Sequence, residues 1–314
     1  MDSPDITIII CTLNRPQQLE EALLSCLALH DLRTYDVEVL VVDNSPEANG
    51  RGVVTRVASS VAANVRYLHE PRIGIAHARN SGITAARAPL IAFIDDDMRV
   101  SPHWLGSVMR CMTERQADAL ICAITPQTED SQQRVDARIL ACYRRDMGLP
   151  EGSRVRIKAN GHIPQAGAGN SVLRRVTCII EAEPFDPQFG NGGEDTDFFL
   201  RLGRRLPKIL WSAESMAYEI VSPARARIDF VTHGALCGSR NLARAMIKNS
   251  RHRQMTRLSL LTIGCAQGAW RMVYYCVLRV RGSADAPYAR LSAVAGFGKV
   301  PWRLGRTAWW ALPR

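Results

Sequence analysis

The sequence of 314 residues lacks the features that mark several classes of protein. None of its nine cysteines belongs to a C-x-x-C pair or to a Cys/His cluster with metal-site spacing, so we expect reduced thiols in the cytoplasm. The N-terminus has acidic residues before Ile6 and neither the basic nor the apolar region of a secretory signal. In the C-terminal part the longest uncharged run, Leu258–Trp270, has 13 residues, whereas a spanning helix needs roughly 20. We therefore expect no secretory signal and no simple transmembrane helix.

Acidic residues are almost missing from the C-terminal region. Residues 251–314 contain 11 Lys or Arg and one acid, Asp285, whereas residues 1–250 contain 29 of each sign. This region therefore accounts for the whole formal charge of +10 and indicates an anionic surface as partner. Four of the six tryptophans also lie there, which favours basic amphipathic helices in the interface of an anionic membrane leaflet. The alternative is a helical subdomain that packs on the rest of the chain.

The first 125 residues alternate buried strands with amphipathic helices. Strands are predicted at 6–11, 37–42, 65–68, 90–94 and 119–124, and helices at 16–29, 51–62, 75–86 and 102–115. This alternation predicts an α/β fold with a largely parallel sheet. Ligands of such sheets bind beyond the carboxyl ends of the strands, where the polar stretches 12–15, 43–44 and 95–97 are expected.

Three consecutive carboxylates, Asp95, Asp96 and Asp97, follow one of these strands. Side chains alternate along a strand, so we expect Asp95 and Asp97 on one side and Asp96 on the other. Carboxylates at the end of a buried strand need a compensating cation, and a hard divalent ion that also binds a phosphate is the usual one. We therefore predict a metal and a diphosphate here. A solvated acidic turn before a helix is the alternative.

A second acidic pair, Glu194 and Asp195, opens a predicted helix after Asn191-Gly192-Gly193. Free N–H groups and the macrodipole at a helix start keep a carboxylate ionised, as a general base requires. A plain acidic first turn is the alternative. The glycine-rich run between Gly161 and Arg175 indicates either a backbone close to a ligand or a tight turn.

Five motifs in this order resemble those of the family 2 glycosyltransferases, which are inverting enzymes that use nucleotide-diphosphate sugars. They are T-L-N-R at 12–15, V-V-D-N at 41–44, G-I-A-H-A-R-N-S-G at 74–82, I-D-D-D at 94–97 and G-G-E-D-T-D-F-F-L-R at 192–201. The resemblance covers about residues 5 to 245 and implies a GT-A type, Rossmann-like mixed sheet, mostly parallel and flanked by helices. It implies a catalytic domain at 1–250, with a nucleotide-binding half at 1–125 and an acceptor half at 126–250, and the charge pattern adds a basic amphipathic helical C-terminal region at 251–314.

The same resemblance implies a role for particular residues. The donor-binding residues would be Asp43 on the nucleotide base, Thr12, Asn14 and Arg15 around it, Arg79 at the nucleotide or its phosphates, and Asp95 with Asp96 near the ribose and sugar. Asp97 would bind Mn²⁺ or Mg²⁺, Asp195 would be the catalytic base, and Glu194 would lie near the acceptor. The family often supplies a further metal ligand from a histidine, and the matching position here holds Glu219, with His233 a less favoured substitute.

The resulting hypothesis is metal-assisted transfer of a sugar, with a UDP-sugar favoured, to a lipid-linked or polysaccharide acceptor at the inner face of the membrane. A metal-dependent nucleotidyltransferase is an alternative, but such enzymes normally carry a glycine-rich basic loop after the first strand, and T-L-N-R-P has no glycine. A non-catalytic binder of membranes or nucleic acid is another. The charge is segregated from the α/β part and no nucleic-acid motif occurs, so we expect no nucleic-acid partner.

Overall fold

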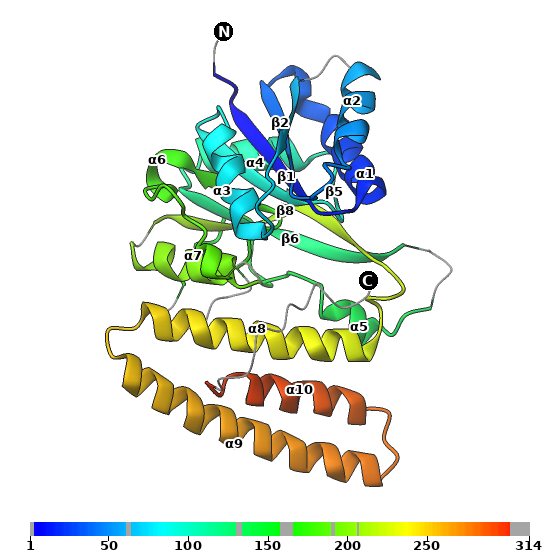
Figure 1. Cartoon of the computed structure of the whole chain (residues 1–314), viewed down its shortest axis with the longest axis vertical. Coiled ribbons are helices and arrows are strands. Elements are labelled where there is room, and N and C mark those ends of the chain that lie inside the picture. The colour runs from blue at the N-terminus through cyan, green and yellow to red at the C-terminus, as the bar shows by residue number, and fades with distance from the viewer. Residues whose placement is uncertain are drawn as a thin grey trace.

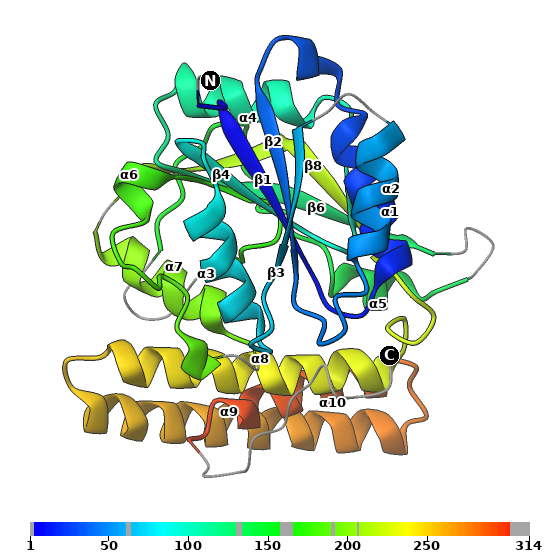
Figure 2. The same cartoon turned by 45° about the horizontal axis from the view of Figure 1, so that its top comes forward.

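A computed structural model describes residues 3–60, 64–129, 134–157, 166–189, 192–205 and 207–301. Its centre is a twisted eight-stranded sheet with the strand order β3-β2-β1-β4-β7-β6-β8-β5 (Figures 1 and 2). The strands are β1 (Ile6–Thr12), β2 (Val37–Asp43), β3 (Asn64–His69), β4 (Leu90–Asp95), β5 (Met98–Val100), β6 (Ala119–Thr128), β7 (Ser171–Arg174) and β8 (Ile209–Val221). The α-helices are α1 (Pro16–Leu27), α2 (Arg51–Ser60), α3 (Ile75–Ala85), α4 (Trp104–Thr113), α5 (Ala137–Ala141), α6 (Arg175–Cys178), α7 (Glu194–Arg204), α8 (Ile228–Asn249), α9 (Arg253–Val280) and α10 (Ala286–Gly298), with 3₁₀ turns η1 (His30–Arg33) and η2 (Pro187–Phe189).

The N-terminal half of the sheet is parallel and covered on both faces. Strands β3, β2, β1 and β4 pair in parallel, and every residue of β1 and β2 is buried. Ile8 and Ile10 belong to the same core as helices α1, α2 and α4, whereas Ile9 and Cys11 pack with α3 and α7. Continuous apolar runs form these strands because neither face meets water. The predicted mixed, mostly parallel sheet between helices is confirmed.

The second half of the sheet is mixed, since β7 and β5 run against their neighbours, and the region around the acidic turn differs from the prediction. Strand β7 is antiparallel to both β4 and β6, while β6 and β8 are parallel. The helix expected from residue 102 begins at Trp104, and Met98–Val100 forms the short strand β5 against β8. Because β4 ends at Asp95, Asp96 and Asp97 lie in a turn. The alternation of sides expected for the three carboxylates therefore does not apply.

Three long helices lie below the sheet in Figure 1 and form a separate layer. Helix α8 contacts α7 on the sheet side and α10 on the other, and α10 packs along α9. No described helix is long and apolar enough to cross a membrane. Trp302, Trp309 and Trp310, on which the membrane prediction partly rests, lie outside the described residues, as do Asn191 and residues 161–165 of the glycine-rich run.

Candidate active site

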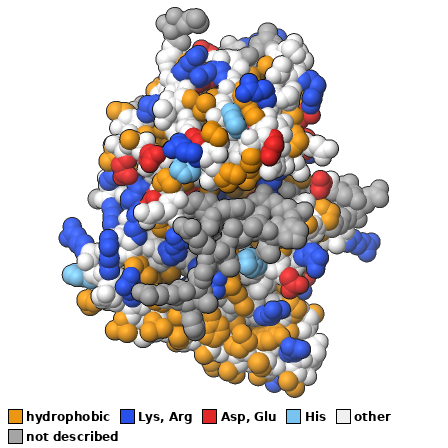
Figure 3. All heavy atoms as spheres, viewed as in Figure 1, with side chains coloured by type: hydrophobic (Ala, Val, Ile, Leu, Met, Phe, Trp, Pro, Cys, Tyr) orange, Lys and Arg blue, Asp and Glu red, His pale blue; other side chains and the backbone are white. Residues whose placement is uncertain are grey.

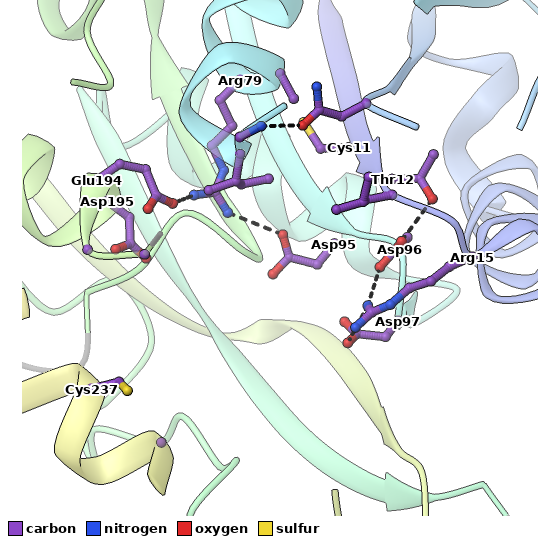
Figure 4. A pocket seen from close by; sticks show the side chains of 18 of the residues that line it. Cys11, Thr12, Arg15, Arg79, Asp95, Asp96, Asp97, Glu194, Asp195 and Cys237 are labelled. Carbon is purple, nitrogen blue, oxygen red and sulfur yellow. Dashed lines mark hydrogen bonds and ion pairs between the residues drawn. The ribbon is translucent and has the colours of Figure 1, made fainter. Parts of the chain in front are cut away.

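A cleft of about 460 Å³ opens at the carboxyl ends of β1 and β4. The start of α7 and one side of α8 form its other walls (Figure 4). The polar and charged residues that line it include Thr12, Arg15, Asn44, Arg79, Asp95, Asp96, Asp97, Glu194, Asp195, Glu219, Arg225 and Asn241. The acidic turn after β4 and the acidic start of α7 therefore face one shared volume.

Asp96 and Asp97 are held by residues that follow β1. The Thr12 hydroxyl donates to Asp96 Oδ2 at 2.8 Å. Arg15 Nη1 donates to Asp96 Oδ1 at 2.7 Å and to Asp97 Oδ2 at 3.2 Å. Thr12 and Arg15 reach the acidic turn because β1 and β4 are parallel neighbours that end at the same edge of the sheet. This contact explains why the T-L-N-R segment and the acidic triplet belong to one site.

A second arginine connects the two expected metal ligands. Arg225 Nη1 donates to Asp97 Oδ2 at 2.6 Å, and its Nη2 donates to Glu219. The guanidinium stacks 4.9 Å from the centre of the Tyr143 ring, and only 12% of the Arg225 side chain is exposed. Burial raises the pKa of Glu219 to about 7, with the charge of Arg225 acting in the opposite direction. Asp97 and Glu219 thus already hold one positive charge between them.

Arg79 connects the acidic turn to the acidic helix. It lies on α3 with 7% of its side chain exposed, its Nη2 is 3.4 Å from Asp95 Oδ1, and its Nη1 donates to Glu194 Oε1. Burial raises the pKa of Glu194 to about 7 against the charge of Arg79. The other carboxyl oxygen of Glu194, Oε2, is buried and has no hydrogen-bond partner among the described residues. That oxygen is an acceptor next to the cleft.

Asp195 lies in the first turn of α7, as predicted. The Thr196 N–H donates to its Oδ1 at 2.6 Å. The chain enters the helix through Gly193 at φ 94°, in the left-handed region that favours glycine. A Cβ on Gly193 would also lie 2.6 Å from the Asn241 Cβ on α8, so glycine is needed here for space as well.

The described end of the glycine-rich run lies close to the carboxylates of Asp95 and Asp195. A Cβ on Gly169 would lie 2.2 Å from Asp95 Oδ2, and one on Gly167 would lie 3.3 Å from Asp195 Oδ2. Arg145 Nη1 donates to the Gly169 carbonyl at 2.7 Å and holds this backbone in place. The small residues therefore let the main chain approach the two carboxylates closely.

Two expected donor-binding residues lie outside the lining of the cleft. Asp43 is fully buried, and its carboxylate accepts hydrogen bonds from the Ser45 N–H at 2.9 Å, the Gly50 N–H at 2.8 Å and the Tyr67 hydroxyl at 2.9 Å. A nucleotide base could reach Asp43 only if this loop moved. Asn14 borders an adjoining hollow, and its N–H donates to Ser45 Oγ at 2.9 Å. Base contacts by these two residues stay predictions.

The sequence analysis placed Asn44 at this edge without a role and missed several other residues of the site. The Asn44 Nδ2 donates to the carbonyls of Glu70 and Arg72 at 2.7 and 2.8 Å, which fixes that loop beside the cleft. The only sequence feature that connected Arg225 with the site is its position six residues after Glu219. Helix α8 contributes mostly small and apolar lining residues, which no polar motif announces: Phe230, Gly234, Cys237 and Gly238.

Few side chains of the cleft are suited to bind a metal ion. Among the described residues, no three His, Cys, Asp or Glu side chains converge as a ligand group. His233 is not part of the cleft lining, and its Nε2 lies 3.4 Å from the Cys237 Sγ. Asp97 and Glu219 still suit a divalent cation, because Mg²⁺ is usually bound through one or two carboxylates together with substrate phosphates.

Comparisons with known proteins identify the family of the chain. The family model described as glycosyl transferase family 2 matches residues 7–176. Succinoglycan biosynthesis protein ExoM of Rhizobium meliloti is 28% identical over 241 residues, or 74% of each chain. The putative glycosyltransferase EpsH of Bacillus subtilis is 24% identical over 144 residues, 46% of this chain and 40% of its own.

Solved structures resemble the whole chain. TarS of S. aureus, solved with UDP, has a TM-score of 0.56 and 14% identity, over 95% of this chain and 90% of its own. The mannosyltransferase PcManGT of Pyrobaculum calidifontis, solved with GDP-Man and Mn²⁺, has a TM-score of 0.58 and 14% identity, over 96% and 88%. These likenesses confirm the GT-A fold. Since the family model spans more than half of the chain, the protein belongs to the family 2 glycosyltransferases and is a glycosyltransferase.

Proposed function

We propose that the enzyme moves a sugar from a nucleotide-diphosphate sugar to an acceptor hydroxyl in one inverting displacement. The proposal rests above all on the shared cleft, in which the acidic turn 95–97 and Asp195 face the same space (Figure 4). One side can hold the charged donor while the other takes the proton of the acceptor. A displacement with one base and no covalent intermediate inverts the anomeric centre.

The donor would lie against the ends of β1 and β4. Thr12, Arg15 and Arg79 supply a hydroxyl and positive charge there, and the exposed part of Asp95 faces the cleft. We favour a UDP-sugar, in keeping with TarS, whose structure contains UDP, although PcManGT was solved with GDP-Man. Asp43 and Asn14 would contact the base once their loop has rearranged.

Asp97 and Glu219 would hold Mn²⁺ or Mg²⁺. When bound, the cation neutralises the negative charge that develops on the departing diphosphate. Arg225 pairs with both carboxylates and would have to release them before they could hold a divalent cation. We propose that Arg225 then leaves the carboxylates and becomes available to the phosphates of the donor.

Asp195 would remove the proton from the acceptor hydroxyl. Its place in the first turn of α7 puts its carboxylate at the cleft, and the free Oε2 of Glu194 can accept a hydrogen bond from a second hydroxyl. Loss of a general base lowers the rate by about 10²–10⁴-fold. Asp195→Asn should therefore abolish most transfer while nucleotide-sugar binding stays close to that of the wild type.

The matched control for this test is Asp229→Asn, which changes an exposed carboxylate in the first turn of α8. Transfer is followed as release of nucleotide diphosphate from a panel of UDP- and GDP-sugars in the presence of Mn²⁺. Equal turnover in the two variants would refute the assignment of the base. Release of pyrophosphate in place of nucleotide diphosphate would refute sugar transfer and indicate a nucleotidyltransferase.

The acceptor that we propose is a hydroxyl of a lipid-linked chain or polysaccharide, met at the inner face of the cytoplasmic membrane. The relative ExoM is named for succinoglycan biosynthesis. The net charge of +10 lies in residues 251–314, and anionic lipids attract such a region. Mass spectrometry of lipid extracts incubated with enzyme and labelled donor tests the acceptor class.

A further inference from the structure

Helix α9 exposes an unusual number of apolar side chains. Of the 14 large hydrophobic residues that are exposed in the described part of the chain, nine lie on this helix. They are Met255, Leu258, Leu261, Ile263, Trp270, Val273, Tyr274, Val277 and Val280, and together we call them the α9 face. Figure 3 shows hydrophobic side chains gathered over the lower edge of the molecule, where α9 lies in Figure 1.

Seven of the nine residues of the α9 face, all except Leu258 and Leu261, form a stripe along the helix. Trp270, Val273, Tyr274, Val277 and Val280 follow one another at spacings that keep them on one side of an α-helix, and Met255 and Ile263 extend the same side toward the start. Trp270 is 74% exposed and Val280 is 88% exposed. A contiguous apolar surface of this kind marks a contact with another molecule or with a membrane.

The opposite side of α9 is fixed against α10 by glycines. A Cβ on Gly268 would lie 2.5 Å from the Phe297 ring, and a Cβ on Gly296 would lie 2.7 Å from the Gly268 nitrogen. A Cβ on Gly264 would lie 2.8 Å from Val300 Cγ2. The backbones of α9 and α10 can approach this closely only when the glycine side of α9 faces α10. Turning the α9 face toward α10 would place large side chains where only glycine fits, so the apolar side stays outward.

The charges around the α9 face identify its partner. Helix α9 contains no acidic residue. Exposed Arg253 and Arg257 lie in its first turns, and exposed Arg279 and Arg281 lie at its end. Arg271, in the middle of the helix, is half-buried and donates to the Ser292 carbonyl on α10 at 3.1 Å. Apolar side chains in the middle with cations at both ends match the acyl boundary and headgroups of an anionic leaflet. A second copy of the chain would bring these arginines together, which disfavours self-association.

We propose that the α9 face is the membrane-docking surface, and that α9 lies in the plane of an anionic bilayer with this face in the headgroup–acyl boundary. The proposal deepens the proposed function, since it names the surface that meets the membrane. Helix α8 lies between α9 and the cleft, which its residues Phe230 and Asn241 line. With helix layers spaced 8–10 Å, docking holds the cleft on the order of 20 Å above the lipid.

The test uses the full chain and sedimentation with vesicles of phosphatidylcholine alone or with one third phosphatidylglycerol. The variant Trp270→Ser/Val273→Ser/Val277→Ser removes apolar surface without adding charge. The matched control Val176→Ser/Ile180→Ser changes exposed residues outside α9, which are 79% and 63% exposed. We expect the wild type and the control to bind anionic vesicles, and the α9 variant to partition at least tenfold less at an unchanged melting temperature.

Equal partitioning of the α9 variant and the control would overturn the proposal. A wild-type dimer in light scattering that the α9 variant breaks, without vesicle binding by either, would overturn it in favour of a second copy. Release of nucleotide diphosphate separates this proposal from the proposed function. A wild type that binds vesicles but releases no nucleotide diphosphate from any donor refutes sugar transfer and leaves the docking surface standing.

Discussion

Replacing Arg225 with Gln should tighten the binding of Mn²⁺ in the absence of donor. In the wild type a metal that takes both Asp97 and Glu219 must first break two charge-assisted hydrogen bonds to the guanidinium. Each such bond contributes about 1.5–3 kcal/mol. Part of this free energy is recovered when water hydrates the released guanidinium. We therefore expect the binding free energy of Mn²⁺ to differ between the variant and the wild type by about 1.4–3 kcal/mol, or ten- to a hundredfold in Kd.

The assay is a titration with Mn²⁺ alone, read from the electron paramagnetic resonance signal of the free ion. Asp97→Asn should abolish binding in the same assay. Arg225→Lys keeps a positive charge but loses the forked geometry, and we expect an intermediate affinity. The matched control is Arg227→Gln, which removes an exposed arginine two residues away. If the Arg225→Gln and Arg227→Gln variants bound Mn²⁺ equally, competition between Arg225 and the metal would be refuted.

Two further predictions concern residues next to the lining of the cleft. Gly169→Ala should lower the free energy of unfolding by about 1–3 kcal/mol and weaken donor binding, because its Cβ would lie 2.2 Å from Asp95 Oδ2. Gly52→Ala in α2, where a Cβ meets nothing within 4 Å, should be neutral or stabilising in the same urea titration, and equal losses in both variants would contradict the steric account. Hydrogen bonds from Arg72 lower the pKa of Glu70 from 4.5 to about 2, so the ionised Glu70 stabilises the fold above about pH 4.5, and this contribution is lost as the pH falls toward 2. Glu70→Gln should therefore cost on the order of 1–2 kcal/mol at pH 7 and much less near pH 3, and a loss that does not depend on pH would contradict this.

The N-terminal half of the fold could be predicted well because its signals are local. Each buried run, such as Ile6–Thr12, is an apolar segment followed at once by polar residues. Parallel pairing then brings Thr12 and the acidic turn to one edge, which needs no knowledge of side-chain packing. The signal for the acidic start of α7 was equally local, because Asp195 lies directly after the glycines in the sequence.

The remaining features depend on contacts between distant segments. Arg225 meets Asp97, 128 residues earlier, only because β5 pairs with β8 in a register that places Glu219 opposite Met98. Strand β5 has three residues, too few for a periodic pattern. The composition of α9 predicted an amphipathic helix, but which way its apolar side faces is decided by glycine contacts with α10.

The shared guanidinium of Arg79 has a kinetic consequence. It divides its charge between Asp95 and Glu194. Under the proposed function, the diphosphate of the donor would attract Arg79 and weaken its ion pair with Glu194, which would change the acceptor pocket before any acceptor is bound. Steady-state measurements with both substrates should then follow a compulsory sequence, with the sugar nucleotide first and the acceptor second.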